Sequence, residues 1–307
     1  MIGRVIDISQ DKRHLSLERG FFVVSSGRDE LGRVPLDDIA AVIVSGHGIT
    51  HSSNLLAALA ERGVPFVLCA SNHHPVGMLW STAGNYRQSG RMDAQLAAPK
   101  PLQKRLWQQV VKSKLRMQAS VLECVSAPTA LLLRLADKVR SGDPDNIEAQ
   151  GARAYWQLLF GSDFRRDREA PGANALLNYG YAVLRAATAR AVMAAGLHPG
   201  LGLHHRNALN PMRLVDDLME PYRPLIDLRV HGMSAAGIQV LEPANKKMLA
   251  DVLYHDLPSP AGVTPVMASI HRLAVSLVQT YEGDQKQLDL PCVAIEPLWL
   301  QDLARSL

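Results

Sequence analysis

The chain has 307 residues, of which 47% are apolar and 20% are charged. This length predicts two domains, and this composition supports a full hydrophobic core and excludes a disordered chain. No run of eighteen apolar residues occurs, and the first residues lack the apolar core of a signal peptide, so we expect no membrane partner. Three widely separated cysteines predict reduced thiols and a cytoplasmic protein: Cys69, Cys124 and Cys292.

The formal net charge is only +4, but it is unevenly distributed. Residues 100–170 hold 13 Lys and Arg against 8 Asp and Glu, whereas the segments before and after them are close to neutral. A basic face of this kind can contact the phosphates of DNA, although solvated helix surfaces produce similar excesses. The densest cluster, on a predicted loop, is Arg165, Arg166 and Arg168.

Residues 1–83 show short apolar stretches with strand periodicity around a single helix. This pattern predicts a small β-sandwich-like N-terminal domain. The helix is expected from Ser53 to Arg62, because Gly63 is a common residue just after a helix end. The strands are expected at 14–18, 20–24, 39–44, 64–69 and 76–80.

Residues 84–100 are polar and contain Gly84, Gly90 and Pro99, which predicts a linker. From 101 to 307 the apolar periodicity is helical, so we expect a larger all-α domain and an α+β fold overall. The last fifteen residues are expected to be an extended tail. Helices are predicted at 102–122, 128–140, 145–160, 173–195, 211–230, 243–254 and 264–281.

Glu148 lies near the start of one predicted helix. Ala152, Tyr155 and Leu159 share its face at helical spacing, so its carboxylate lies on a largely apolar side where it needs an ionic partner or a metal. Alternatively, Asp145 caps the helix and Glu148 reaches back to complete a capping box. The residue types leave both interpretations open.

A second acidic group follows the predicted helix start at Asn210 and Pro211, a favourable N-cap and first-turn pair. Asp216, Asp217 and Glu220 fall together on the arc opposite the apolar stripe of this helix. Such an acidic arc is ordinarily the solvated side of a helix, which is the alternative to a functional site.

Pro221 changes this expectation, because it removes a backbone hydrogen bond and disfavours α geometry at Glu220. A kink there can turn Glu220 toward the preceding loop, which carries His204 and His205. Two carboxylates and one imidazole from three elements suit a hard divalent metal and phosphodiester chemistry. Spacing does not distinguish between the two histidines.

Four motifs follow the strand-rich first third in a fixed order. Glu148 lies in an Ile-Glu-Ala-x-Gly-Ala-x-x-Tyr-Trp run, residues 174–181 read Asn-Ala-Leu-Leu-Asn-Tyr-Gly-Tyr, residues 202–205 read Gly-Leu-His-His, and residues 216–224 read Asp-Asp-Leu-Met-Glu-Pro-Tyr-Arg-Pro. Together they resemble the CRISPR-associated integrase that captures new spacers, in the form found with type II systems. The resemblance covers nearly the whole chain.

The resemblance implies a metal-dependent DNA integrase and endonuclease that joins short DNA fragments to a CRISPR repeat array by 3′-hydroxyl transesterification, as part of antiviral defence. It implies that Glu148, His205 and Glu220 are the catalytic residues and the ligands of Mg²⁺ or Mn²⁺, with Asp217 beside the site. It also implies double-stranded DNA as partner and a homodimer formed through the N-terminal domains. Two such dimers would flank a dimer of a small ferredoxin-like companion in a heterohexamer.

Two other functions fit parts of the pattern. The first is a non-catalytic DNA-binding scaffold, in which the acidic residues are helix surface. The second is a zinc hydrolase of small molecules. No P-loop, dinucleotide fingerprint, HExxH or GxSxG motif occurs, and no serine or cysteine has the context of a catalytic triad, so metal-assisted chemistry is favoured.

Overall fold

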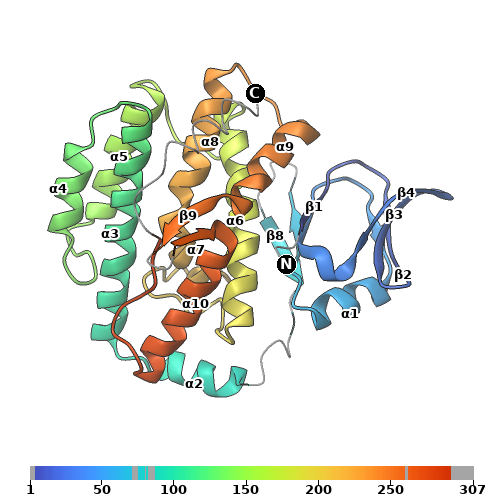
Figure 1. Cartoon of the computed structure of the whole chain (residues 1–307), viewed down its shortest axis with the longest axis horizontal. Helices are drawn as coiled ribbons and strands as arrows, with labels where there is room; N and C mark the ends of the chain where they lie inside the picture. The colour runs from blue at the N-terminus through green and yellow to red at the C-terminus, as the bar shows by residue number, and fades with distance from the viewer. Residues whose placement is uncertain (1–3, 71–74, 80, 82–86, 260–261, 292–307) are drawn as a thin grey trace.

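The computed structural model describes residues 4–70, 75–79, 81, 87–259 and 262–291 (Figure 1). The predicted C-terminal tail and Cys292 lie outside these residues. Strands gather in the N-terminal part and helices in the rest of the chain, so the predicted α+β fold is confirmed. Within the described residues, no helix is long and apolar enough to cross a membrane.

The N-terminal domain is built from two four-stranded sheets and one helix. Its elements are β1 (Arg4–Ile8), β2 (His14–Glu18), β3 (Phe21–Ser26), β4 (Asp29–Pro35), β5 (Ile39–Val44), β6 (Thr50–His51), α1 (Ser53–Glu61), β7 (Phe66–Cys69) and β8 (Pro75–Leu79). The first sheet has the order β1-β5-β7-β8, in which β1, β5 and β7 are parallel and β8 is antiparallel. The second sheet has the order β4-β3-β2-β6.

Strand β5 joins the two domains, because all of its residues are buried. Val42 and Val44 face the core of the N-terminal domain, whereas Ala41 and Ile43 pack into the core of the helical domain. This two-sided burial explains the unbroken apolar run in the sequence. The core between the sheets also contains Leu15, Phe22, Leu36, Leu55, Leu59 and Phe66.

The rest of the described chain is mainly helical, and α3 and α6 lie at its centre (Figure 1). The elements are α2 (Gln88–Ala97), α3 (Lys100–Cys124), α4 (Ala130–Lys138), α5 (Ile147–Phe160), α6 (Ala173–Ala194), α7 (Arg213–Met219), the 3₁₀ turn η2 (Glu220–Tyr222), α8 (Arg223–Ala235), α9 (Pro243–Ala250), the 3₁₀ turn η3 (Asp251–Tyr254), β9 (Asp256–Ser259), β10 (Gly262–Pro265) and α10 (Val266–Glu282). Helix α3 packs against α4, α5, α7, η2 and α8. It therefore contacts every helical element that carries a predicted ligand.

The structure corrects the prediction of a linker over residues 84–100. Helix α2 occupies most of this segment and packs against α10. The buried Gln95 amide donates to the carbonyl oxygens of His198 and Leu201, at 3.1 and 2.9 Å, and this anchors the helix. The polar composition of this segment therefore did not distinguish a helix from a linker, because the buried face of α2 is itself partly polar.

Several predicted helices have different boundaries in the structure, and the segment 243–254 is divided into α9 and η3. The segment 211–230 is divided into α7, η2 and α8, with the break at Pro221. The predicted helix 264–281 begins only at Val266, because residues 262–265 form β10, which pairs antiparallel with β9 at residues 256–259. Pro258 and Pro265 lie in these strands, and proline ordinarily argues against a strand, so the pair was not predicted.

A polar contact between the two domains lies beside a cavity. Asp7 of β1 accepts a hydrogen bond from the Tyr179 hydroxyl at 3.0 Å and lies 3.5 Å from the Lys246 ammonium of α9. The adjoining cavity, of about 600 Å³, is lined by residues of β1, β3 and β4 on the N-terminal side and of α9 and η3 on the helical side. It holds none of the predicted ligands.

Candidate metal centre

Glu148 is positioned by the turn that precedes α5. Asp143, whose φ is +49°, is buried, and its carboxylate accepts the backbone N–H groups of Ile147 and Glu148 at 2.8 and 3.0 Å. These bonds satisfy two of the free donors at the helix start and fix its first turn. The predicted capping box is wrong, because Asp145 instead forms an ion pair with Arg140.

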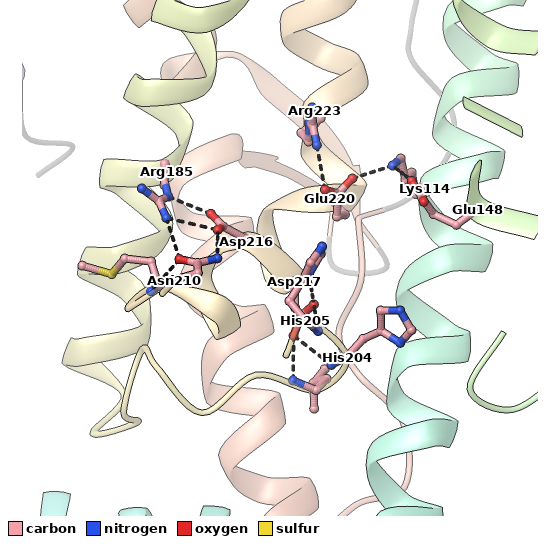
Figure 2. A network of polar contacts seen from close by, with 12 residues as sticks. Lys114, Glu148, Arg185, His204, His205, Asn210, Asp216, Asp217, Glu220 and Arg223 are labelled. Carbon is pink, nitrogen blue, oxygen red and sulfur yellow. Dashed lines mark hydrogen bonds and ion pairs between the residues drawn. The ribbon is translucent and has the colours of Figure 1, made fainter. Parts of the chain in front are cut away.

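Lys114 of α3 forms an ion pair with Glu148, a role that the sequence alone did not predict. Its side chain is buried, and its ammonium forms ion pairs with Glu148 and, at 2.6 Å, with Glu220 Oε2 (Figure 2). Lysine is ordinarily an exposed residue, so its residue type in the predicted helix 102–122 gave no sign of this burial. The available signal was its position one turn from the apolar Val110, Val111 and Met117, all of which are buried.

Glu220 is buried at the break in the predicted acidic helix. Helix α7 ends at Met219 and the turn η2 begins at Glu220, next to Pro221, which has no backbone N–H to donate. Glu220 itself keeps α geometry, with φ −51° and ψ −43°, so the predicted departure from α geometry at this residue is wrong. The Arg223 guanidinium donates to Glu220 Oε1 at 2.7 Å. Burial alone would raise the pKa of Glu220, but the Arg223 and Lys114 cations outweigh it and lower the pKa to about 2. Glu220 is therefore an ionised carboxylate at neutral pH.

Asp217 organises the loop that carries the two histidines. It is fully buried, which overturns the solvated-arc interpretation, and its Oδ2 accepts the backbone N–H groups of Leu203 and His204 at 2.6 and 3.0 Å. Its Oδ1 lies 2.6 Å from His205 Nδ1. Because the carboxylate only accepts, Nδ1 carries the hydrogen, and the neutral His205 ring keeps a lone pair on Nε2. The hydrogen bond with Asp217 raises the pKa of His205.

Gly202 provides the space that Asp217 needs. A Cβ atom at this position would lie 2.8 Å from Asp217 Oδ2 and 3.0 Å from the His205 carbonyl oxygen. We expect Gly202→Ala to displace the carboxylate and to lower the free energy of unfolding by about 1–3 kcal/mol, as overpacking does. Urea unfolding followed by circular dichroism measures this change.

The control uses the same substitution at a site with free space. A Cβ atom at Gly90 in α2 meets no heavy atom within 4 Å. Gly90→Ala should therefore raise the free energy of unfolding by roughly 0.5–1 kcal/mol, because alanine favours helix. A Gly202→Ala variant as stable as the wild-type protein would contradict the close approach of Asp217 to Gly202.

Asp216 does not contribute to the centre. The Arg185 guanidinium of α6 donates to its two carboxylate oxygens at 2.7 and 3.1 Å, and Asn210 Nδ2 donates at 2.7 Å. Asn210 Oδ1 accepts the Met212 N–H at 2.9 Å, but α7 begins only at Arg213 and its N-cap position is Met212, so the predicted helix start at Asn210 and Pro211 is wrong. Figure 2 shows this cluster apart from Glu148 and Lys114.

The three predicted ligands line one cavity of about 220 Å³. Its lining consists of Trp107, Asp143, Asn146, Glu148, His204, His205, Arg206 and Glu220. Trp107 was not predicted, and its ring stacks on His204 with centroids 4.4 Å apart and planes 4° apart. His204 is thus held by packing, whereas Asp217 orients His205. This difference favours His205 as the imidazole ligand.

The donor set fits a hard divalent ion in chemical type, since it offers two carboxylates and one imidazole with a defined tautomer. In the part of the chain that the structure describes, however, no three His, Cys, Asp or Glu side chains already stand close enough to hold an ion. The Lys114 ammonium lies between the two carboxylates instead (Figure 2). The negative charge of these carboxylates is therefore offset by a cation of the protein itself, Lys114.

Arg223 links the centre to a deeper polar group. Its guanidinium lies over the Tyr181 ring, 4.3 Å from the centroid, and the Tyr181 hydroxyl donates to the buried Asp227. Burial raises the pKa of Asp227 to about 6, despite the hydrogen bond from Tyr181, which lowers it. Ionisation of the Asp227 carboxyl near neutral pH therefore lowers the free energy of unfolding.

We expect Asp227→Asn to change the pH dependence of stability. A carboxyl group with a folded pKa near 6 and an ordinary value of 3.8 binds its proton more tightly in the folded state. Wild-type stability, relative to the variant, should therefore fall by about 2 kcal/mol as pH rises from 4 to 6, and stay nearly level above 7. Urea unfolding over this range measures it. A difference that does not vary with pH would contradict the raised pKa.

The basic cluster predicted to grip DNA lies on the expected loop between α5 and α6. Arg166 is engaged within the protein, however, because its guanidinium donates to the side-chain oxygens of Asn174 and Asn178 at 2.9 and 2.7 Å. The Arg165 guanidinium donates to the Ser162 carbonyl oxygen at 2.8 Å. At least Arg166 therefore holds the loop on α6 rather than presenting a free cation.

Comparison with known proteins assigns the chain to a family. A family model described as CRISPR associated protein Cas1 matches residues 6–240, which include Glu148, His205 and Glu220. The chain belongs to the Cas1 family. It is 38% identical over 287 residues to the CRISPR-associated endonuclease Cas1 of Neisseria meningitidis serogroup C (strain 8013), with 92% of this chain and 94% of that one covered.

Solved structures show the same Cas1 fold. A casposase bound to integration product superposes with a TM-score of 0.80 at 17% identity and covers 99% of both chains. A Cas6-RT-Cas1–Cas2 complex gives a TM-score of 0.77 at 17% identity, over 96% of this chain and 37% of the other. At this identity, the likeness supports the fold alone.

Proposed function

We propose that this Cas1 protein is a metal-dependent DNA integrase and endonuclease that joins short DNA fragments to a CRISPR repeat array. The observation that carries the proposal is the cavity that Glu148, His205 and Glu220 share. Glu148 comes from α5, His205 from the loop before α7, and Glu220 from η2. The relationship to a CRISPR-associated endonuclease supports it. The role extends to antiviral defence, because new array segments record foreign DNA.

The proposed ligands of Mg²⁺ or Mn²⁺ are Glu148, His205 and Glu220. Such an ion, when bound, would polarise a phosphate of the repeat and stabilise the developing charge. The protein residues prepare this chemistry. Asp217 holds the His205 Nδ1–H, Asp143 fixes the first turn of α5, and Arg223 helps to keep Glu220 ionised.

The proposed reaction is a transesterification. The 3′-hydroxyl oxygen of the incoming fragment attacks a phosphorus atom at the end of the repeat and loses its proton. The bond from that phosphorus to the 3′-oxygen of the neighbouring nucleotide breaks, and this oxygen gains a proton. Because DNA supplies the nucleophile, the reaction needs no catalytic serine or cysteine. Water in place of the hydroxyl gives endonuclease activity.

The proposed assembly has double-stranded DNA, both fragment and array, as its substrate. Residues 1–83 would form the homodimer, and residues 101–307 would be the catalytic domain. Two dimers would flank a dimer of a ferredoxin-like companion, and a structural neighbour described as containing Cas1 and Cas2 supports such a partner. The free thiols of Cys69 and Cys124 fit a cytoplasmic location.

The alternatives are weaker. A non-catalytic scaffold requires the acidic residues to be helix surface, yet Asp217 and Glu220 are buried and face the histidine loop or Lys114. A small-molecule zinc hydrolase would bind zinc tightly and work without Mg²⁺ or Mn²⁺. Neither alternative explains the match to the Cas1 family model.

A joining assay tests the proposal. The protein and its companion are incubated with a labelled fragment and DNA that carries the repeat array, in Mg²⁺, Mn²⁺, Zn²⁺ or EDTA. We expect a joined product with Mg²⁺ or Mn²⁺ and none with EDTA. A fragment ending in a 3′-dideoxynucleotide should give no product, because it lacks the nucleophile. Joining in EDTA, or of the dideoxy fragment, would contradict the mechanism.

A further inference from the structure

The centre contains a cation of its own in Lys114. The side chain is 7% exposed, and its ammonium contacts Glu148 of α5 and Glu220 of η2, the two carboxylates proposed as metal ligands. An ammonium in this environment is costly unless it is paired, so the position is not a chance contact of a surface lysine. Lys114 links two elements that the chain separates by more than seventy residues.

The charges of this group are already balanced. Glu148 and Glu220 contribute two negative charges, and Lys114 and Arg223 contribute two positive charges. Both oxygens of Glu220 face a cation, since Oε1 accepts from Arg223 and Oε2 lies 2.6 Å from Lys114. A divalent ion bound by these carboxylates would add two positive charges to these four balanced groups.

The two cations differ in how easily they can leave. Arg223 is held by Glu220 and by the face of the Tyr181 ring, and its planar guanidinium matches both contacts. Lys114 is a compact point charge on a flexible stem, and the contacts described for its ammonium are the two carboxylates. Lys114 is therefore the cation that metal binding would displace.

We propose that Lys114 occupies the cation position of the metal-free protein, where it holds Glu148 and Glu220 together and competes with the divalent metal for them. This inference rests on the proposed function, because it requires that these carboxylates bind metal. Competition lowers the affinity for metal in the absence of DNA. Phosphates of bound DNA would supply the negative charge that offsets the displaced ammonium, so metal and DNA would bind cooperatively.

Metal binding to Lys114→Met tests the inference directly. Isothermal titration with Mn²⁺, without DNA, should give a dissociation constant about tenfold or more below the wild-type value, because the competing charge is gone. Lys112→Met, two residues away on α3, is the matched control and should bind as the wild type does. Lys114→Gln provides a second neutral variant that can still hydrogen-bond both carboxylates, should the methionine variant fold poorly.

Stability without metal gives an independent readout. In EDTA, Lys114→Met should melt at least about 5 °C below the wild type, because the partly buried Glu148 loses its described cation and the buried Glu220 loses one of its two. The double variant Lys114→Met, Glu148→Gln should recover part of this loss, since it removes the carboxylate charge that Lys114 pairs in the wild type. Added Mn²⁺ should raise the melting temperature of Lys114→Met more than that of the wild type.

The outcomes separate this inference from the proposed function. If the wild type binds Mn²⁺ and both Lys114 variants bind it with equal or lower affinity, competition is overturned while the metal site stands. If neither the wild type nor the variants bind Mn²⁺, the metal site and this inference are both overturned. Tighter binding by either neutral variant, with Lys112→Met unchanged, supports the displacement of Lys114.

Discussion

Replacement of Glu148 by glutamine is expected to reduce joining of a labelled fragment to repeat DNA by roughly 10³-fold or more, because a neutral amide is a poor ligand for a hard divalent ion. Glutamine keeps the size of the side chain and can still accept a hydrogen bond from Lys114. DNA binding, measured by fluorescence anisotropy, should stay within about threefold of the wild-type value, since phosphate contacts dominate affinity.

The matched control for this prediction is Glu123→Gln on α3. Glu123 is exposed and does not line the 220 Å³ cavity, so joining should be unchanged. If Glu148→Gln joins DNA at the wild-type rate, the protein uses another centre or serves as a scaffold. Equal losses of joining and of DNA binding would assign Glu148 to the DNA interface rather than to the chemistry.

Replacement of Asp217 by asparagine should have the second largest effect. The two carboxylate oxygens of Asp217 accept the N–H groups of Leu203 and His204 and the His205 ring N–H. Asparagine has only one acceptor oxygen in their place. At least one buried donor is left without a partner, so we expect a loss of about 2–3 kcal/mol in the free energy of unfolding. Because the His205 tautomer is no longer fixed, Mn²⁺ affinity should fall by about 10–100-fold.

Asp93→Asn on the exposed face of α2 is the control for this charge change and should alter neither quantity. Urea unfolding and Mn²⁺ titration on the same samples separate the two effects. If Asp217→Asn binds Mn²⁺ as the wild type does, then the orientation of His205 by Asp217 is not required for metal binding. If stability is also unchanged, the hydrogen bonds described for Asp217 do not form in solution.

The sequence predicted the order of elements better than their exact ends. Helices α3, α5 and α6 follow from apolar periodicity, and the break at Pro221 follows from proline backbone chemistry. The paired strands β9 and β10 were not predicted, because they are short, contain proline and lack a strand-like alternation. Helix α2 was not predicted, because a partly polar buried face does not differ in sequence from a linker.

The individual site residues could be named from the resemblance, but their environment could not. Asp217 has the pattern of a solvated helix residue, and its burial depends on backbone N–H groups of a loop that no residue type reveals. Lys114 reads as a surface lysine, since its partners Glu148 and Glu220 come from distant segments. The stacking of Trp107 on His204 depends likewise on tertiary packing.

A crystal structure of the protein soaked in Mn²⁺, with an anomalous difference map recorded near the manganese edge, tests the central claim. We predict a single strong peak in the 220 Å³ cavity, within about 2.4 Å of Glu148, of His205 Nε2 and of Glu220. The Lys114 ammonium should have moved away from both carboxylates. An empty cavity at saturating Mn²⁺, or a peak bound by other side chains, would contradict the proposed metal centre.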